Sequence, residues 1–155
     1  MLLELLDPRT IALNYPAQDA EDVIRHLSGL LAIRHYVRET FADAALRREA
    51  ELPTGLKLAG DIHAAIPHTD VEHVIKPGVA LATLPQPVSF RHMIDPDEEV
   101  PVRLVFLLAL EQPKSQVAML QEVATILQSP SLVLKLVNAA NMDEIEAALT
   151  TADVS

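Results

Sequence analysis

The chain has 155 residues, half of them hydrophobic, which predicts a single domain with a sizeable core. Its 22 acidic residues against 12 Lys and Arg give a formal net charge of −10, which argues against binding to nucleic-acid phosphates. The absence of cysteine excludes disulfides and thiolate metal sites. An acidic balance fits a partner with a basic face, although plain solubility explains it equally well.

The N-terminal residues, MLLELLDPRT, are apolar but acidic, and they lack the basic start and long apolar run of a signal peptide. No apolar run approaches the roughly 20 residues that span a bilayer. We therefore expect a soluble, cytoplasmic protein without an inserted membrane segment. The segment Met1–Leu6 can pack on the protein's own core or on a second chain, so the oligomeric state stays open.

The first third of the chain predicts one strand and two helices. A strand is expected over residues 10–15, closed by Pro16, whose ring fixes φ and removes a donor. Asp19 is a suitable N-cap for a helix of about 14 residues. A second helix is expected from Tyr36 to the charged residues before Pro53. The inward side chains of the first helix recur at helical spacing: Val23, Leu27, Leu30 and Leu31.

Strand patterns dominate residues 61–110. Short strands are expected at residues 64–66, 79–84 and 88–90, followed by a polar loop over 91–99. The nearly continuous apolar run 102–110 suits a central strand buried on both faces, although a buried helix fits the same pattern.

Helical patterns return after Pro113. A long helix is expected over residues 116–128, then a short one over 132–137, and a last one capped by Asn141 with Glu144 in a capping box. Helices on both sides of a run of strands predict an α/β fold, with a mixed central sheet flanked by helices on both faces. The expected buried stripe of the long helix is Val117, Leu120, Val123, Ala124 and Leu127.

The segment 51–78 holds His63, His68 and His73, three of the six histidines. His68 follows Pro67, so we expect it on a rigid turn at the end of a strand, with its imidazole outward. A neutral imidazole is a good nucleophile near pH 7 and suits a phosphate relay. No GxxxxGK[ST] sequence occurs, so the chain is not expected to be an ordinary ATP-dependent kinase.

A zinc site built from these three histidines is not favoured. Neighbouring members lie five residues apart, which lacks the i,i+4 spacing of a helical metal motif. An odd separation along a strand also puts side chains on opposite faces. We therefore expect no metal and no other cofactor.

The sequence LPTGL followed by AAIPHTDVEHV resembles the active-site signature of the enzyme IIA family of the sugar phosphotransferase system (PTS), in its mannitol/fructose-type fold. The ordered set PTGL, IPHTD and EHV is most similar to the galactitol-like branch, and the likeness extends over residues 8–150. It implies one IIA domain over residues 1–155. It also implies a phosphotransferase in which His68 accepts a phosphoryl group from phospho-HPr and passes it to a IIB component during sugar uptake.

The resemblance also assigns candidate residues around His68. Arg48 matches the family's arginine before the Pro-Thr pair, and a guanidinium can fork onto phosphate oxygens. Its alternative is a solvated arginine at a helix end, a role that also suits Arg47. Thr54 can offer a hydroxyl to the phosphoryl group or simply serve a turn. Asp70 can orient a site residue or lie solvated in the turn.

Many mannitol- and fructose-type members carry a second histidine near the start of the penultimate long helix. Aligned on Gln116-Val117, that position is Lys114 here. A lysine can meet a phosphate as a point charge beside a helix N-terminus, but it shuttles a proton less readily at pH 7. Its alternative is a surface lysine. His73 is expected near the active face, and His63 at a loop or edge.

Two other functions share the same motif. One is a regulatory IIA-like module whose phosphorylation state is read by a partner protein, because two negative charges on a turn can switch a surface. The other is a relic of the fold without phosphotransfer, which the lysine at position 114 would permit. The sequence does not indicate the sugar, whose specificity rests largely with the membrane partner.

Overall fold

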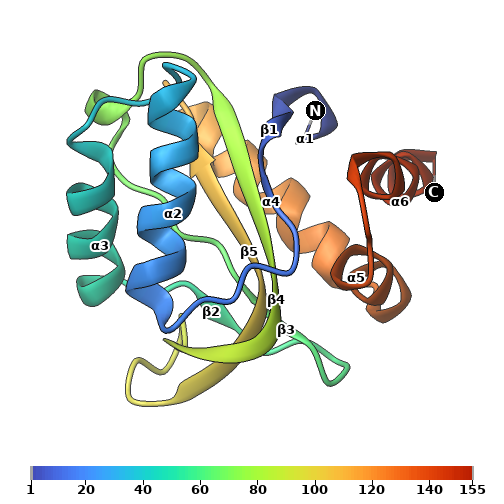
Figure 1. Ribbon diagram of the computed structural model, residues 1–155. Coiled ribbons are helices and arrows are strands. Elements are labelled where there is room, and N and C mark those ends of the chain that lie inside the picture. Colours follow the sequence, from blue (N-terminus) through green and yellow to red (C-terminus); the bar gives the residue numbers. More distant parts are fainter. Residues whose placement is uncertain (1, 155) are drawn as a thin grey trace.

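The structure, a computed structural model, describes residues 2–154, with side chains described to residue 150 (Figure 1). A mixed five-stranded sheet in the order β1-β4-β5-β3-β2 forms the centre. In chain order the elements are α1 (Leu2–Leu5), β1 (Leu6–Ala12), α2 (Ala20–Ile33), α3 (Phe41–Glu51), β2 (Gly55–Leu56), β3 (His63–Ala65), η1 (Val71–His73), β4 (Gly78–Arg91), β5 (Glu99–Ala109), α4 (Pro113–Leu127), α5 (Pro130–Val137) and α6 (Met142–Val154).

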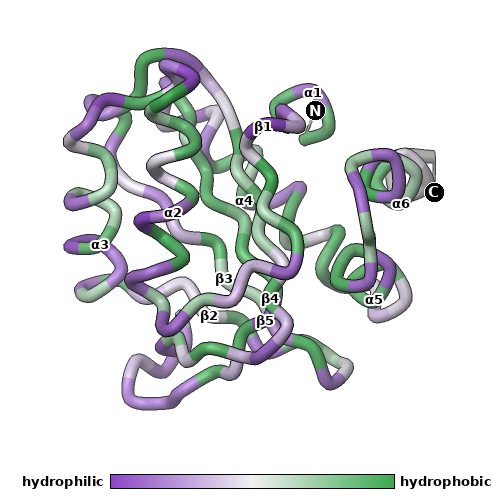
Figure 2. The backbone as a smooth tube through the Cα atoms, viewed as in Figure 1, coloured by the Kyte–Doolittle hydropathy of each residue, from purple (hydrophilic) through white to green (hydrophobic). Residues whose placement is uncertain are grey.

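Helices cover both faces of this sheet, which confirms the predicted fold class. Figure 1 shows α2 and α3 on one side of the strands and α4, α5 and α6 on the other. Alternate residues of a strand point to opposite faces, so β5 serves two separate cores. Val105 and Leu107 pack with α2 and α3, whereas Phe106 and Leu108 pack with α4, α5 and α6. Figure 2 shows these hydrophobic strands at the centre and hydrophilic residues outside, most clearly on α3.

The central strand is confirmed, but its partner differs from the prediction. β4 is one continuous strand, where the sequence predicts two short ones, at 79–84 and 88–90. Its pairing with β5 slips between Thr83 and Val88, and the exposed residues 85–87 fall in that gap. Proline cannot donate to a ladder, and a bulge is where a strand accommodates it. The predicted loop 91–99 is shorter, because β5 already begins at Glu99.

The N-terminal elements are shifted relative to the prediction. β1 begins at Leu6 instead of residue 10, and it tolerates Pro8 because it lies at the edge of the sheet. The 14-residue α2 and its cap are confirmed, since the Asp19 carboxylate accepts the Asp22 N–H at 2.8 Å. The next helix begins only at Phe41, because the chain turns at His35 with a φ of 63°. Leu2 and Leu6 pack into the protein's own core.

The C-terminal helices keep their predicted order. The buried stripe of α4 was partly mispredicted, because Val117 is 55% exposed while Met119 and Ile126 are buried. Asn141 caps α6 through the Glu144 N–H at 3.0 Å, but the Glu144 carboxylate accepts the Ala140 N–H in place of the capping-box partner. Within residues 2–154 no single helix meets the length and hydropathy of a membrane span, and α4 with α5 would do so only as a pair bent by 96°.

Candidate functional site

His68 lies at the centre of the candidate site, on the segment that leaves β3. This segment stays against β5, because the Leu108 N–H donates to the Pro67 carbonyl at 3.0 Å and His68 pairs with Leu108 in a parallel bridge. The expected outward imidazole was wrong, since His68 is only 7% exposed. Pro67 has no backbone N–H to donate, but its carbonyl still accepts from β5, and this bond keeps His68 on the sheet.

The orientation of the imidazole is fixed by one backbone contact. His68 Nδ1 lies 2.9 Å from the Ile66 carbonyl oxygen, in a buried contact. A carbonyl can only accept, so this contact assigns the proton of the neutral ring to Nδ1 and leaves the lone pair on Nε2. Burial lowers the pKa of His68, the Ile66 contact partly opposes this shift, and nearby Arg48 lowers it again. The ring is therefore a neutral base with a free Nε2 near pH 7.

Arg48 comes to the same site from the last turn of α3. Its Nη1 lies 3.6 Å from Asp70 Oδ1, a distance longer than a normal hydrogen bond. Its Nε is buried and has no hydrogen-bond partner within the described part of the chain. A guanidinium carries five N–H donors in a planar fork, so Arg48 keeps donors for a further anion.

A polar cavity of about 200 Å³ lies beside Arg48 and the residue that follows His68. It brings together Arg47, Arg48, Asp70 and His73, all named from the sequence, and adds Thr69. His73 Nδ1 lies 2.8 Å from the Thr40 hydroxyl, while Asp70 is 71% exposed. Two arginines of α3 and the acceptors of the segment after His68 therefore face one small hollow, which Glu51 and Glu72 also line.

Thr54 is linked to this site through its backbone. Its carbonyl accepts the Ile66 N–H at 3.3 Å, one residue before Pro67. Its buried hydroxyl donates to Glu49 Oε1 and its N–H donates to Glu49 Oε2, both at 2.8 Å. Gly55 follows where a Cβ would come within 2.5 Å of the Arg91 carbonyl oxygen, so this close approach requires glycine.

Lys114 lies exposed in the first turn of α4. Within residues 2–154 no hydrogen bond or ion pair joins it to His68, Arg48 or Thr54. The neighbouring Gln116 makes the direct connection, since its Nε2 donates to the Thr69 carbonyl at 2.9 Å. The start of α4 is thereby held against the segment that carries His68.

His63 belongs to a different environment. Its Nδ1 accepts the Leu58 N–H at 2.9 Å, and burial lowers its pKa. It lies in β3, between β5 and β2, and closes the loop that joins β2 to β3. No group of three or more His, Cys, Asp or Glu residues in the described chain is placed to hold a metal ion.

Two residues of the site were missed by sequence reasoning. Glu49 follows Arg48 directly in the sequence, but its contacts with Thr54 span a helix end and could not be read from spacing. Gln116 served only to align the start of α4, and its partner Thr69 is 47 residues away. The only feature of the sequence that could have indicated Glu49 or Gln116 was that each is a polar residue in a stretch already assigned to the site.

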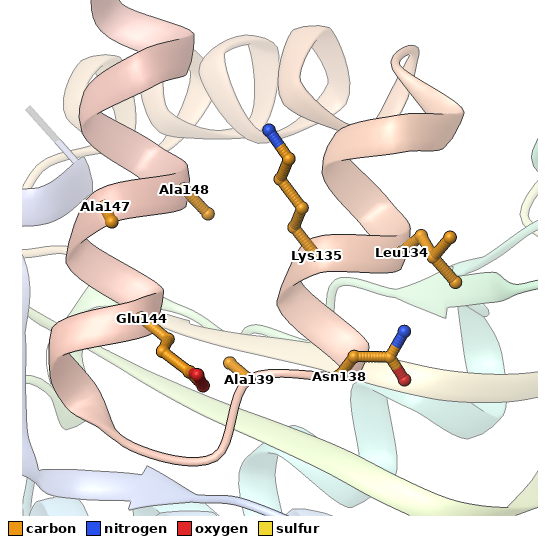
Figure 3. Close-up of a pocket in the computed structure, with 7 residues that line it drawn as sticks. All are labelled: Leu134, Lys135, Asn138, Ala139, Glu144, Ala147 and Ala148. Carbon is orange, nitrogen blue, oxygen red and sulfur yellow. The ribbon is translucent and has the colours of Figure 1, made fainter.

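A larger cavity of about 490 Å³ lies elsewhere, between α5 and α6 (Figure 3). None of its lining residues belongs to the histidine site, so size does not mark the reactive region of this protein. Its lining residues are Leu134, Lys135, Asn138, Ala139, Glu144, Ala147 and Ala148.

Known proteins resemble the chain in both sequence and structure. The family model described as "Phosphoenolpyruvate-dependent sugar phosphotransferase system, EIIA 2" matches residues 4–152. The galactitol-specific EIIA component of the PTS from Escherichia coli (strain K12) is 33% identical over 120 residues, which cover 77% of this chain and 78% of that protein.

Two solved structures from Escherichia coli are similar to it at 27% sequence identity. The crystal structure of IIA mannitol superposes with a TM-score of 0.76, over 92% of this chain and 97% of that one. The complex of enzyme IIA mannitol with phosphorylated enzyme IIB mannitol contains a chain with a TM-score of 0.76, over 95% of this chain and 99% of that one.

Proposed function

The chain belongs to the EIIA 2 family of the phosphoenolpyruvate-dependent sugar phosphotransferase system, and from this premise we propose that His68 is its phosphorylated residue. The chain is a IIA component of a sugar PTS, a phosphotransferase that works through a phosphohistidine. The observation that supports His68 is its buried imidazole, whose Nδ1–H is held by the Ile66 carbonyl while Nε2 keeps its lone pair.

The transfer step follows from this arrangement. The Nε2 lone pair attacks the phosphorus of a donor phosphohistidine, and a new N–P bond forms as the donor's N–P bond breaks. No proton is lost, because Nε2 is already free and Nδ1 keeps its hydrogen. The phosphorylated ring then carries positive charge, which the Ile66 carbonyl stabilises through the same contact. Transfer to the acceptor reverses these bond changes.

Arg48 is proposed to hold the phosphoryl oxygens. Its buried Nε has no partner and its Nη1 makes only a long contact with Asp70, so donors are available without breaking a strong bond. A guanidinium can bind two phosphoryl oxygens at once. Lys114 is proposed to add a point charge from the first turn of α4, and Thr54 to hold the segment through its carbonyl, since its buried hydroxyl already donates to Glu49.

The partners are proposed from the family and the surface. Phospho-HPr is the donor, and a IIB component is the acceptor, as the structure of IIA mannitol with phosphorylated IIB mannitol from Escherichia coli supports for that relative. Leu52, which follows α3 and lines the cavity beside Arg48, and Val117, which follows Gln116 on α4, are each 55% exposed and suit an apolar docking rim. We further propose that residues 1–155 form one domain and that it works in the cytoplasm.

The test is phosphorylation by phosphoenolpyruvate, enzyme I and HPr, followed by intact mass and ¹⁵N NMR of the histidine rings. The wild type should gain about 80 Da as an acid-labile phosphate on Nε2, and the His68→Ala variant should gain nothing. His35→Asn is the matched control, because His35 does not line the cavity beside Arg48 and Asn tolerates its positive φ, and it should behave as wild type. A folded wild type that gains no mass would overturn the proposal.

A further inference from the structure

We infer that Glu49 is a positioning residue for phosphoryl transfer, which acts on His68 through Thr54 and Ile66. The inference rests on the proposed role of His68 and adds a residue that touches neither the phosphoryl group nor the reacting nitrogen. A chain of hydrogen bonds carries it from α3 to the imidazole.

The first link joins Glu49 to Thr54. The two carboxylate oxygens of Glu49 accept separately from the N–H and the hydroxyl of Thr54, each at 2.8 Å. Thr54 is only 3% exposed, so neither donor has water as a ready substitute. Burial raises the pKa of Glu49, while both contacts with Thr54 lower it, as expected of a carboxylate held as an acceptor. The carboxylate therefore fixes the loop that begins at Pro53.

The second and third links reach the nucleophile. The Thr54 carbonyl accepts the Ile66 N–H at 3.3 Å, and the Ile66 carbonyl accepts His68 Nδ1–H at 2.9 Å. Pro67 lies between them in the sequence and has no N–H of its own to anchor. Ile66 is thus the last residue before His68 that can be held by its backbone donor. A shift of the Thr54 loop moves the carbonyl that sets the tautomer of His68.

Glu49 also stands next to Arg48 on the last turn of α3. Neighbouring residues of a helix point about 100° apart, so one turn sends Arg48 to the cavity beside Asp70 and Glu49 to the Thr54 loop. Arg48, which is proposed to bind the phosphoryl group, and Glu49, which supports the segment of His68, are therefore held by the same helical turn and move together. This coupling matters because group transfer is sensitive to misplacement of about 1 Å.

The experiment compares Glu49→Ala with Glu49→Gln. Glutamine can accept from the Thr54 N–H with its oxygen and donate to the hydroxyl with its NH₂, so it should keep the loop in place. The readouts are the tautomer and pKa of His68 by ¹⁵N NMR, and the rate of phosphoryl transfer from phospho-HPr. Glu146→Ala, on the exposed side of α6, is the control for loss of a carboxylate.

Glu49→Ala should convert a single Nδ1–H tautomer into a mixture, raise the pKa of His68 towards its ordinary value as water enters, and slow transfer at least tenfold, on the order expected for misplacement. Glu49→Gln and Glu146→Ala should stay close to wild type. A folded Glu49→Ala protein with an unchanged tautomer and rate would overturn the inference. If Glu49→Ala does not fold, the Thr54→Val variant tests the inference instead, because it removes only the hydroxyl bond to Glu49. This variant should still shift the tautomer of His68. An unchanged tautomer in Thr54→Val would also overturn the inference.

The two proposals fail in different ways. If wild type accepts no phosphate, the proposed function is wrong, whereas the tautomer measurement on unphosphorylated protein still tests Glu49. If wild type accepts phosphate on His68 and both Glu49→Ala readouts are unchanged, only the positioning role is lost.

Discussion

Two histidines near opposite ends of β3 have opposite ring polarities. His63 Nδ1 accepts from the Leu58 N–H, so its proton resides on Nε2. His68 Nδ1 donates to the Ile66 carbonyl, so its Nε2 keeps the lone pair. Burial lowers the pKa of both rings. The comparison teaches that burial alone does not prepare a nucleophile, and that the backbone group facing Nδ1 decides whether Nε2 can attack.

The largest expected effect is on phosphate acceptance, which should differ between substitutions of His68 and of His63. His68→Ala should abolish phosphate acceptance because the nucleophile is gone. His63→Ala should keep acceptance and cost about 1 kcal/mol of the free energy of unfolding, the usual value of one lost hydrogen bond. Intact mass after phosphorylation and urea denaturation measure the two effects. A folded His63→Ala protein that accepts no phosphate would contradict the different roles of the two histidines.

Arg48 sharpens the comparison, because its guanidinium acts on His68 and keeps an unpaired buried Nε, whereas the charges that act on His63 are those of Lys57 and Asp61. Arg48→Ala should slow transfer about 10²-fold, the scale of one lost preorganised donor to transition-state charge. Arg47→Ala, the exposed neighbour that lines the same cavity, should change the rate far less. Single-turnover kinetics with phospho-HPr measure both. Equal losses would show that the cavity supplies general positive charge and no specific ligand.

Lys114 should have a smaller effect. Lys114→Ala should slow transfer a few-fold, since an exposed point charge in water contributes on the order of 1 kcal/mol. Lys135→Ala, on α5 beside the unrelated cavity of Figure 3, is the matched control for loss of an exposed lysine. Transfer rates at low and high salt measure the effect, and the loss should shrink as salt screens the charge. A rate that is unchanged at low salt would remove Lys114 from the site.

The smallest expected effect is on stability, and here both histidines act alike. A pKa lowered by burial means that the unfolded chain binds more protons between the folded pKa and about 6.5. The free energy of unfolding should therefore be fully retained above about pH 6.5 and fall as the pH drops through the folded pKa values. Urea denaturation between pH 7.5 and 5 measures this slope. His63→Ala and His68→Ala should each flatten it, and an unchanged slope in both would contradict the shifts.

The predictable parts of the fold depend on local signals. Asp19 and Asn141 cap the helices they were expected to cap, because an N-cap and its partner lie within one turn. The apolar run 102–110 was predicted as a central strand with a buried helix as its alternative, and its continuous hydrophobicity is the local signal that β5 bears out. The split of β4 was wrong because Pro85 and Pro87 break a local strand pattern, whereas pairing with β5 on both sides of the bulge restores it.

The positions of the candidate residues agree with the sequence only in part, because Lys114 makes no described contact with the others, and the roles of all of them in phosphoryl transfer stay predictions. The sequence named His68, Arg48, Thr54 and Asp70, and the structure brings these together around one segment. It could not show that the Pro67 carbonyl continues the pairing with β5, and so the imidazole was expected outward. Contacts such as those of Gln116 with Thr69 join distant parts of the chain, and neither periodicity nor spacing encodes them.

The burial of His68 also bears on fidelity. A phosphohistidine is a high-energy intermediate, and every molecule of water that reaches its N–P bond dissipates the energy first stored in phosphoenolpyruvate. With only 7% of His68 exposed, an N–P bond formed at this proposed site would be largely closed to bulk solvent. The phosphorylated protein should therefore outlive free phosphohistidine in water. The fold would thereby slow hydrolysis of the phosphohistidine and favour transfer of the phosphoryl group to its acceptor protein.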